Sequence, residues 1–168
     1  MSAAWIAAAP RPKPLDDVRV ERHPAFASAD PARRYAPLAA PVRAHALGEA
    51  FQLDRLPYLL AYVGDQAVGA VSLALHGDDL VLLGFGGQPE LGAVGLCSAL
   101  LAEAQQVGRE IGRRRLVAPL TNADPLPFFF LQAEGFCLAE VLPYSGPGRR
   151  GPGDIAVTHE LVLERPIG

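Results

Sequence analysis

The sequence predicts a single α+β domain of the three-layer kind, built on a mixed, mostly antiparallel sheet of about six to seven strands. Three apolar runs, 56–63, 67–76 and 80–85, are joined by two tight Gly-Asp turns, as in an antiparallel meander. The last run continues through a glycine-rich segment into a helix of about four turns, and a further apolar run ends near residue 121. These two patterns predict the sheet and its main helix.

Length and composition fit one compact domain. The chain has 168 residues, half of them apolar, and its 15 basic and 18 acidic residues give a formal net charge of -3, which disfavours binding to nucleic acid. No run approaches the ~18 apolar residues of a membrane span. Cys97 and Cys137 suit a reduced cytoplasm better than a disulfide scaffold, and they offer too few ligands for a metal site.

The N-terminal part of the chain is predicted to begin with a lead-in. Residues 1–15 lack the basic start of a signal peptide, and Pro10 closes their short apolar run, so we interpret them as a mobile segment before a domain at 16–168. Alternation of apolar and charged residues over 18–21 predicts the first strand.

A helical region is predicted next. Asp30 suits an N-cap and Pro31 the first helical position, so a helix is expected to begin there, to be interrupted by Pro37 and Pro41, and to resume over 42–51. Any polar side chain here is either a substrate contact or a solvated helix residue. The polar candidates are Tyr35, Arg43, His45 and Glu49.

The segment from Gly86 to Ser98 is interpreted as a glycine-rich turn that leads into a helix. The first N–H groups of a helix have no intrahelical partner and lie at its positive end, so such a turn can bind phosphate, and Ser98 adds a hydroxyl at the first turn. A plain strand-to-helix turn is the alternative. Apolar residues at 96, 100, 104, 107 and 111 predict one buried stripe along the helix.

Order and spacing across this block carry a family resemblance. Residues 89–101 read PELGAVGLCSALL; Asn122 follows the next strand, and a short helix over 125–134 leads to Gly135-Phe136. This resembles the GNAT family of acetyl-CoA-dependent N-acetyltransferases, whose pyrophosphate loop typically reads Pro-Glu-x-Arg-Gly-x-Gly-x-Gly/Ala-x-x-Leu-Leu and whose next strand ends in Asn. The resemblance covers roughly 16–165. It implies helices on both faces of the sheet and splayed central strands.

The resemblance also implies a reaction and its partners. Acetyl-CoA or another acyl-CoA is expected to lie between the splayed strands, with its pantetheine arm paired to strand backbone, and the acceptor is expected to be a small-molecule or peptide amine. A backbone N–H near Phe85 to Gly87 is expected to polarise the thioester carbonyl. A homodimer is compatible with the family. The cofactor-binding residues implied are Phe85, Gly86, Gly87, Gly92, Ala93, Val94, Gly95, Leu96, Cys97, Ser98, Asn122, Phe129 and Phe130.

The C-terminal part of the chain is expected to complete the acceptor pocket. A strand over 138–142, a loop over 143–153 and a last strand over 155–163 are predicted, with the loop at the rim of the pocket. Arginines 113–115 either compensate the helix dipole or send one guanidinium to the 3'-phosphate of CoA. The polar side chains available on the acceptor side are Tyr144, Arg149, Arg150 and His159.

Departures from the family pattern leave the chemistry open. Gly92 replaces the loop Arg, and Leu131 stands where the family usually has a Tyr that protonates the departing thiolate. No catalytic acid or base is therefore assigned. Cys97, in place of a Gly or Ala, is either a reactive thiolate at a helix start or a small buried residue. Two functions remain: an N-acyltransferase that works by direct attack, and a catalytically weak or inactive acyl-CoA-binding module or subunit.

Overall fold

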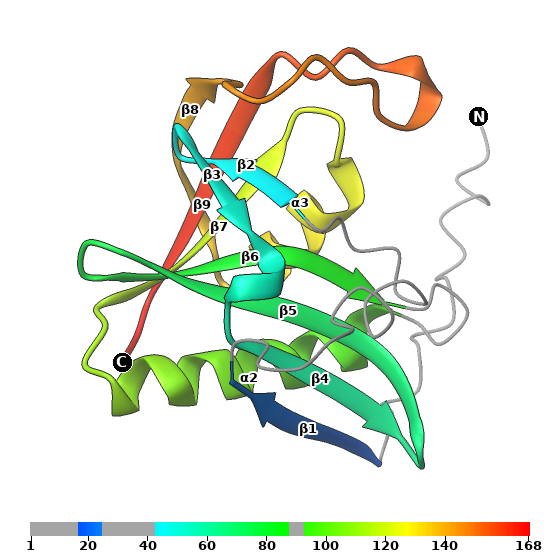
Figure 1. Ribbon diagram of the computed structural model, residues 1–168, viewed down its shortest axis with the longest axis vertical. Helices are drawn as coiled ribbons and strands as arrows, with labels where there is room; N and C mark the ends of the chain where they lie inside the picture. Colours follow the sequence, from blue (N-terminus) through cyan, green and yellow to red (C-terminus); the bar gives the residue numbers. More distant parts are fainter. Residues whose placement is uncertain (1–16, 25–42, 88–92) are drawn as a thin grey trace, which may run out of the picture.

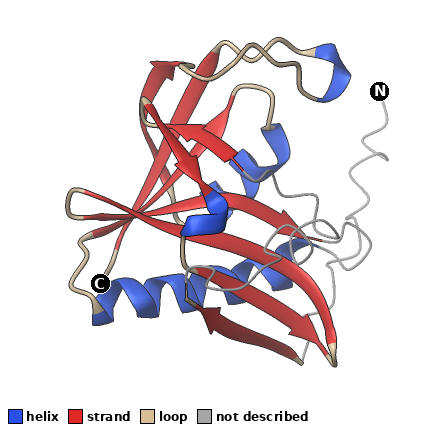
Figure 2. Ribbon diagram, in the orientation of Figure 1, coloured by secondary structure: helices blue, strands red, loops and turns tan. Residues whose placement is uncertain are grey.

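The computed structural model describes residues 17–24, 43–87 and 93–168, which form a seven-stranded mixed sheet and a separate two-stranded hairpin, together with helices (Figures 1 and 2). The strand order is β1-β4-β5-β6-β7-β9-β8, and every neighbouring pair is antiparallel except β6 and β7. The predicted α+β class is confirmed. The predicted lead-in lies outside the described residues.

The bounds of the strands follow the predicted meander closely. Its two turns contain Gly64 (φ 58°) and Gly77 (φ 56°), a backbone conformation that glycine adopts without strain. The strands of the main sheet are β1 (Val18–His23), β4 (Tyr58–Val63), β5 (Gln66–His76), β6 (Asp79–Gly87), β7 (Arg115–Thr121), β8 (Cys137–Pro143) and β9 (His159–Pro166). The described helices are η3 (Leu53–Arg55), α2 (Ala93–Glu110), α3 (Pro125–Ala133) and η5 (Pro152–Asp154).

The prediction of a helix over 42–51 is wrong. This stretch forms an antiparallel hairpin of β2 (Arg43–Ala46) and β3 (Glu49–Gln52). Leu47 (φ 53°) and Gly48 (φ 76°) both have positive φ, as a two-residue hairpin turn requires. Tertiary packing outweighs the helix propensity of this alanine-containing stretch. The earlier part of the predicted helix, over 30–41, lies outside the described residues.

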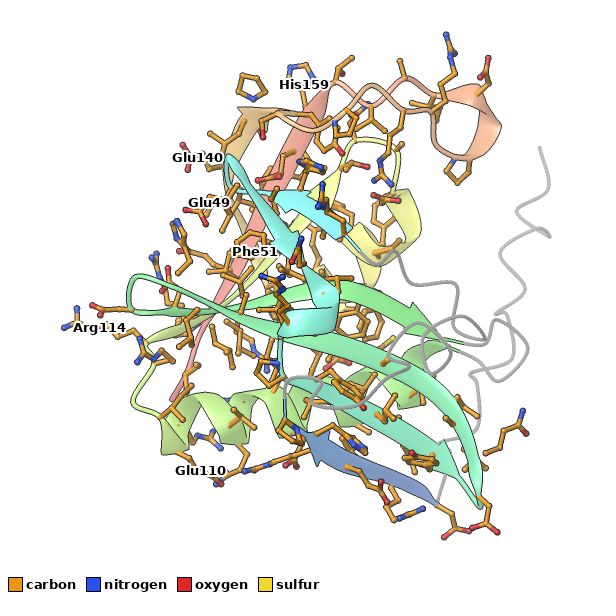
Figure 3. The ribbon with its side chains drawn as sticks, viewed as in Figure 1. Glu49, Phe51, Glu110, Arg114, Glu140 and His159 are labelled. Carbon is orange, nitrogen blue, oxygen red and sulfur yellow. The ribbon has the colours of Figure 1, made fainter. Side chains whose placement is uncertain are left out.

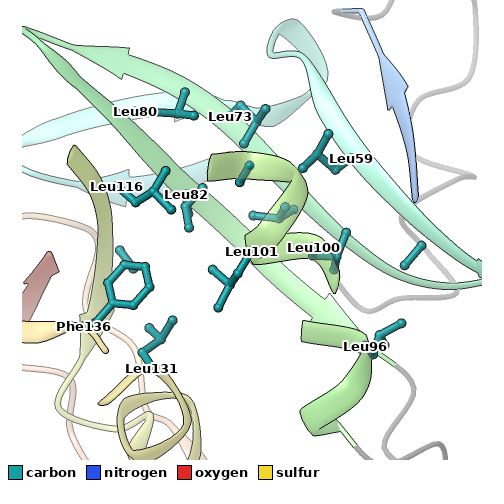
Figure 4. Close-up of a cluster of buried hydrophobic side chains, with 14 of the residues drawn as sticks. Leu59, Leu73, Leu80, Leu82, Leu96, Leu100, Leu101, Leu116, Leu131 and Phe136 are labelled. Carbon is teal, nitrogen blue, oxygen red and sulfur yellow. The ribbon is translucent and has the colours of Figure 1, made fainter. Parts of the chain in front are cut away.

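Helix and hairpin lie on opposite faces of the sheet. On one face, Leu96 and Leu100 of α2 pack with Leu82 of β6 in the larger core cluster, which also includes Leu131 of α3 (Figure 4). On the other face, a second cluster unites the hairpin and η3 with the sheet. Its buried members are Ala46, Leu53, Ala74, Val81, Leu83, Val117 and Val162. The hairpin thus covers the face where the sequence predicted a helix.

The helix α2 shows the predicted stripe as far as Val107, while Ile111 lies beyond the helix end and is 44% exposed. Gly108 has a packing role, because a Cβ there would overlap Cδ1 of Ile167. Gly112 follows with φ +69° and ends the helix. Among the described helices, none is long and apolar enough to cross a membrane.

The last strand begins later than predicted. Residues 155–158 precede it, with Ala156 bridged to Arg150, and β9 runs from His159 to Pro166 instead of over 155–163. The side chain of Asn122 forms hydrogen bonds with the backbone of this segment. Cys137 is exposed on β8.

Candidate functional site

The two parallel strands at the centre of the sheet pair over a short distance and then separate. Asp79–Val81 are in register with Arg115–Val117, whereas β6 stays paired with β5 to Gly87 and β7 stays paired with β9 to Thr121. Figure 1 shows β6 and β7 running apart from this short pairing. Beyond it, the facing edges of the two strands do not pair with each other. The predicted splay is confirmed.

A β-bulge in β6 shapes one edge of this gap. Gly84 and Phe85 together lie opposite Val71 of β5, and Gly84 has φ +60°. The extra residue turns Phe85 onto the α2 face, where it packs against the larger cluster, although Leu83 two residues earlier packs on the hairpin face. A Cβ on Gly84 would lie 2.8 Å from Cδ1 of Leu53, so glycine also allows η3 to pack closely here.

In the glycine-rich segment, the boundaries of strand and helix differ from the prediction. Gly86 and Gly87 belong to β6, paired with Ala70 and Gly69, and so are not part of a turn. Residues 88–92, including Gly92, lie outside the described residues. The helix α2 begins at Ala93, so Ala93, Val94 and Gly95 form its first turn. The backbone N–H groups of this first turn have no intrahelical hydrogen-bond partner.

The prediction that Ser98 lies in the first turn of the helix is wrong. Ser98 is the sixth residue of α2. Its hydroxyl donates to Oε1 of Glu134 at 2.6 Å. The backbone oxygen of Glu134 accepts from Arg165 at 2.7 Å, and Arg165 also donates to Gln105 and lies over the ring of Phe136 at 5.0 Å. Burial lowers the pKa of Arg165. Ser98 is therefore part of a network that joins α2, the end of α3 and β9.

The neighbouring residues on α2 face the core. Leu96 is fully buried, so its side chain stabilises the fold and only its backbone lies near the helix start. Cys97 is partly buried, and burial raises the pKa of its thiol to about 12, with the charge of Glu134 adding to the effect. This environment favours the small buried residue over the reactive thiolate.

The short helix α3 presents no phenol at the expected position. Leu131 is 3% exposed and packs in the larger cluster beside Phe136 (Figure 4). Of the two predicted contacts, Phe130 is half-buried against the same cluster, while Phe129 is 66% exposed and meets Phe128 edge to face. The side chain of Phe129 is thus not part of the core packing.

Asn122 uses its side chain to hold the segment before β9. Its Nδ2 donates to the carbonyl of Ala156 at 3.0 Å, and its Oδ1 accepts from the backbone N–H groups of Thr158 and His159 at 2.9 and 3.0 Å. The amide is therefore engaged with protein backbone at the open end of β7. Any contact between Asn122 and a cofactor would use the backbone rather than this amide.

Polar side chains gather where β7 ends. Thr121 donates its hydroxyl to Asp124 at 2.5 Å, and Asp124 lies 3.8 Å from the guanidinium of Arg149. Arg149 in turn lies 5.9 Å from the ring centroid of Tyr144. A Cβ on Gly146 would overlap the Tyr144 phenol and come within 2.8 Å of Cβ of His45. The loop after β8 and the β2–β3 hairpin therefore meet beside the gap.

The structure thus unites His45, Tyr144 and Arg149, but not the other predicted acceptor-side residues. Arg150 pairs with Asp154 at 3.0 Å, and His159 contacts Thr158 at 2.9 Å. Figure 3 shows His159 and Glu49 at the outer edge of the molecule. Arg43 lies at the start of β2, and Tyr35 lies outside the described residues.

Sequence reasoning missed Glu160, which is 3% exposed on β9 and in register with Thr121. Its Oε1 accepts the backbone N–H of Leu47 in the hairpin turn at 2.7 Å. Burial raises the pKa of this carboxyl, and the hydrogen bond from Leu47 opposes the shift. A signal was present, because Glu160 alternates in phase with the inward-facing Val162 of the same strand.

The arginines at the other end of α2 make structural contacts. Arg113 donates to the carbonyl of Gly77 at 3.0 Å, Arg114 lies 3.8 Å from Asp78, and Arg115 pairs with Asp79 and Glu164 at 2.8 and 2.7 Å (Figure 3 labels Arg114). An α-helix of this length separates them from the N-terminus of α2 by about 27 Å. The dipole and ion-pair interpretation fits better than a contact with the 3'-phosphate. Among the described residues, no group of three or more His, Cys, Asp and Glu side chains could hold a metal ion.

Similarity to known proteins lies in the structure and not in the sequence. No protein-family model matches the chain, and no curated protein matches it by sequence. The chain is similar in structure to an IAA acetyltransferase from Bacillus cereus, with a TM-score of 0.65 and 18% identity, over 89% of this chain and 99% of that chain.

Two further similar structures contain a ligand. A GNAT family acetyltransferase from Elizabethkingia anophelis with acetyl-CoA bound has a TM-score of 0.63 and 14% identity, over 90% of this chain and 99% of that one. A Bacillus subtilis acetyltransferase in complex with CoA has a TM-score of 0.64 and 13% identity, over 89% and 99%. Such low identities establish the fold alone, and this chain has the fold of the GNAT acetyltransferases.

Proposed function

We propose that the protein is an acyl-CoA-dependent acyltransferase that transfers an acetyl or other acyl group to an amine. The observation that carries this proposal is the splay of β6 and β7 beyond Val81 and Val117, together with a helix that begins six residues after β6 ends. The unpaired strand edges offer hydrogen bonds to the two amides of the pantetheine arm, as an added strand would. The N-terminus of α2 is suited to the diphosphate.

Two of the similar structures hold CoA or acetyl-CoA, which supports the same ligand class here. The contacts proposed for the diphosphate are backbone N–H groups of the segment leading into α2, including Gly92 to Gly95. Such contacts do not depend on the loop arginine that this chain lacks. The proposal also includes the exposed Phe129 as a side-chain contact of the cofactor.

The bulge in β6 supplies the proposed electrophilic assistance. A backbone N–H near Phe85 to Gly87 would polarise the thioester carbonyl, and the gap would hold the two substrates in line. The amine nitrogen attacks the carbonyl carbon, the C–N bond forms and the C–S bond breaks. The departing thiolate takes its proton from solvent or from the second proton of the amine, because Leu131 offers none.

A catalytically weak or inactive acyl-CoA-binding module is the second candidate. The burial of Leu131, at 3% exposed, favours it, because no phenol lies at the position that usually supplies the acid in the resembled family. The two candidates share the cofactor and differ in turnover. The acceptor amine, a homodimer and a cytoplasmic location stay predictions from the sequence.

Binding and turnover can be tested separately. At about 100 times its dissociation constant, CoA should stabilise the protein by about 2.7 kcal/mol, measured as a rise in unfolding temperature. Gly95→Asp should abolish the rise, because its carboxylate repels the diphosphate while an acidic residue in the first turn suits the helix itself. Gly95→Ala is the matched control. Absence of a shift with millimolar CoA would remove both candidates; a shift without thiol release from acetyl-CoA would leave the binding module.

A further inference from the structure

A hollow with two arginines lies at the open end of the β2–β3 hairpin, where β2 begins and β3 ends. Its volume is about 510 Å³. Arg43 is in register with Gln52, so their side chains lie on one face of the hairpin, whereas Phe51 packs on the other face against the second cluster. Both faces therefore contribute, which places the hollow at the end of the hairpin. The lining residues are Arg43, Ala50, Phe51, Gln52, Arg55 and Leu56.

The two arginines of this hollow differ from every other arginine in the described part of the chain. Arg43 and Arg55 are exposed, and neither forms an ion pair or a hydrogen bond with a described residue. Two guanidinium groups that line one hollow without a counter-ion repel each other, and an anion in the hollow would relieve this repulsion. The described arginines that pair with a carboxylate or donate to a backbone oxygen are Arg19, Arg22, Arg109, Arg113, Arg114, Arg115, Arg149, Arg150 and Arg165.

The helix η3 connects this hollow to the gap between β6 and β7. Arg55 is its last residue, and Leu53, its first, lies against the β6 bulge, because a Cβ on Gly84 would come within 2.8 Å of Cδ1 of Leu53. The hairpin packs as a second layer over β6, β7 and β9 through the second cluster. Since such layers lie about 10 Å apart, a group bound in the hollow lies on the order of 10 Å from the strands that separate.

We propose that Arg43 and Arg55 bind an oxyanion at the far end of the acceptor, so that the substrate class is a primary amine whose other end carries a carboxylate or a phosphate. The inference rests on the proposed transfer reaction, because it names the acceptor of that reaction. A guanidinium presents a fork of N–H donors that matches either oxyanion, and the amide of Gln52 can add a further donor. Phe51 and Leu56 offer apolar surface to an extended chain between the anion and the amine.

The competing explanation is that both arginines are only solvated surface residues. The double substitution Arg43→Gln and Arg55→Gln removes both charges and keeps side chains that can donate hydrogen bonds. The control is Arg114→Gln, which makes the same change on an arginine 81% exposed; Figure 3 shows Arg114 at the outer edge, away from Phe51. Because Arg43 and Arg55 form no bond within the described residues, the double variant should unfold at the same temperature as the wild type or slightly above it.

Turnover tests the anion directly. Release of CoA thiol from acetyl-CoA is measured with 6-aminohexanoate, 6-aminohexyl phosphate and hexylamine, which share their carbon chain and differ at the end remote from the amine. The wild type should have a kcat/KM at least about 10-fold higher for an anionic acceptor than for hexylamine. The double variant should lose about 10- to 100-fold on the anionic acceptors and stay within about threefold on hexylamine, while the control matches the wild type.

Two further comparisons sharpen the assignment. The acceptor with the larger advantage over hexylamine identifies the oxyanion as carboxylate or phosphate. Glycine should gain nothing from its carboxylate, because it is too short to reach both the hollow and the gap. A variant with Arg43→Lys and Arg55→Lys keeps the charges but not the fork, so its kcat/KM for the anionic acceptors should lie between those of the wild type and the double Gln variant.

Binding gives a readout that does not need turnover. Affinities for the product 6-acetamidohexanoate and for N-hexylacetamide, which lacks the carboxylate, are measured by calorimetry in the presence of CoA; N-acetylated 6-aminohexyl phosphate replaces the first if phosphate is preferred. The wild type should bind the anionic product at least about 10-fold more tightly than N-hexylacetamide. The double Gln variant should bind the two with equal affinity.

The outcomes separate this inference from the function on which it rests. Equal kcat/KM of wild type and double variant for both anionic acceptors, with thiol release retained, would overturn the anion site and leave the transfer reaction intact. An equal loss on hexylamine would also overturn it, because the arginines would then act on every acceptor alike. No thiol release by the wild type with any acceptor, together with selective loss of the anionic product by the double variant, would overturn the transfer while the oxyanion site stands.

Discussion

At the scale of single residues, Gly84 is part of the β-bulge that shapes one edge of the proposed site. Its φ of +60° and the proximity of Leu53 make any side chain there costly, whereas a Cβ on Gly77 (φ +56°) would meet nothing within 4 Å. Gly77→Ala should cost about 1–2 kcal/mol for the left-handed conformation alone. Gly84→Ala should cost about 1–3 kcal/mol more through overpacking and should weaken the CoA-induced thermal shift. If denaturant unfolding shows the same loss of unfolding free energy in both variants, and CoA raises the unfolding temperature of both equally, the bulge has no part in ligand binding.

The two cysteines provide a second prediction at this scale. Burial raises the pKa of Cys97, so that its thiol is largely protonated at pH 8, whereas Cys137 is exposed on β8. Iodoacetamide should therefore modify Cys137 at least about 100-fold faster than Cys97, as measured by mass spectrometry on the single-cysteine variants Cys97→Ala and Cys137→Ser. Raising the pH should accelerate the reaction of Cys97 throughout the accessible range. Comparable rates at pH 8 would mean that the helix N-terminus activates Cys97 after all.

At the scale of elements, the sequence predicts what local patterns determine. The meander follows from apolar runs and Gly-Asp turns, and α2 follows from its apolar stripe, because each signal lies within a few residues of its structure. The hairpin was missed because Leu47-Gly48 is an unusual turn and the flanking residues have good helix propensity. Its strand conformation depends on packing against Val81 and Val162, which are remote in sequence.

The candidate site shows the same limit. The splay and the gap were predicted from the order of motifs, since the resemblance places a cofactor between these two strands. The hydrogen-bond partners of Ser98 and Asn122 were not predicted, because only the tertiary structure brings Glu134 and the carbonyl of Ala156 next to them. Glu160 was missed for a related reason: a glutamate in a strand is usually solvated, whereas this one is buried and accepts a hydrogen bond from Leu47, which is remote in sequence.

At the scale of the whole molecule, the two faces of the sheet have separate tasks. The α2 face holds the larger core cluster and the proposed diphosphate site, and the hairpin face holds Glu160 and the polar groups at the end of β7. The paired ends of β6 and β7, tied by Arg115 to Asp79 and Glu164, keep the two strands together below the gap. A ligand in the gap would therefore touch both faces while leaving the paired end unchanged.

This arrangement predicts a specific pattern of hydrogen exchange when CoA is added. Backbone amides over 82–87 and 93–98 should exchange more slowly, because the pantetheine arm pairs with the free edge of β6 and the diphosphate binds the first turn of α2. Amides over 110–116 and in β1 should not change, since the arginines at that end of α2 already pair with Asp78, Asp79 and Glu164. Pantetheine alone, which lacks the diphosphate, should protect the strand but not the helix. Protection centred on 110–116 would instead place the ligand at the opposite end of α2 and contradict the proposed binding mode.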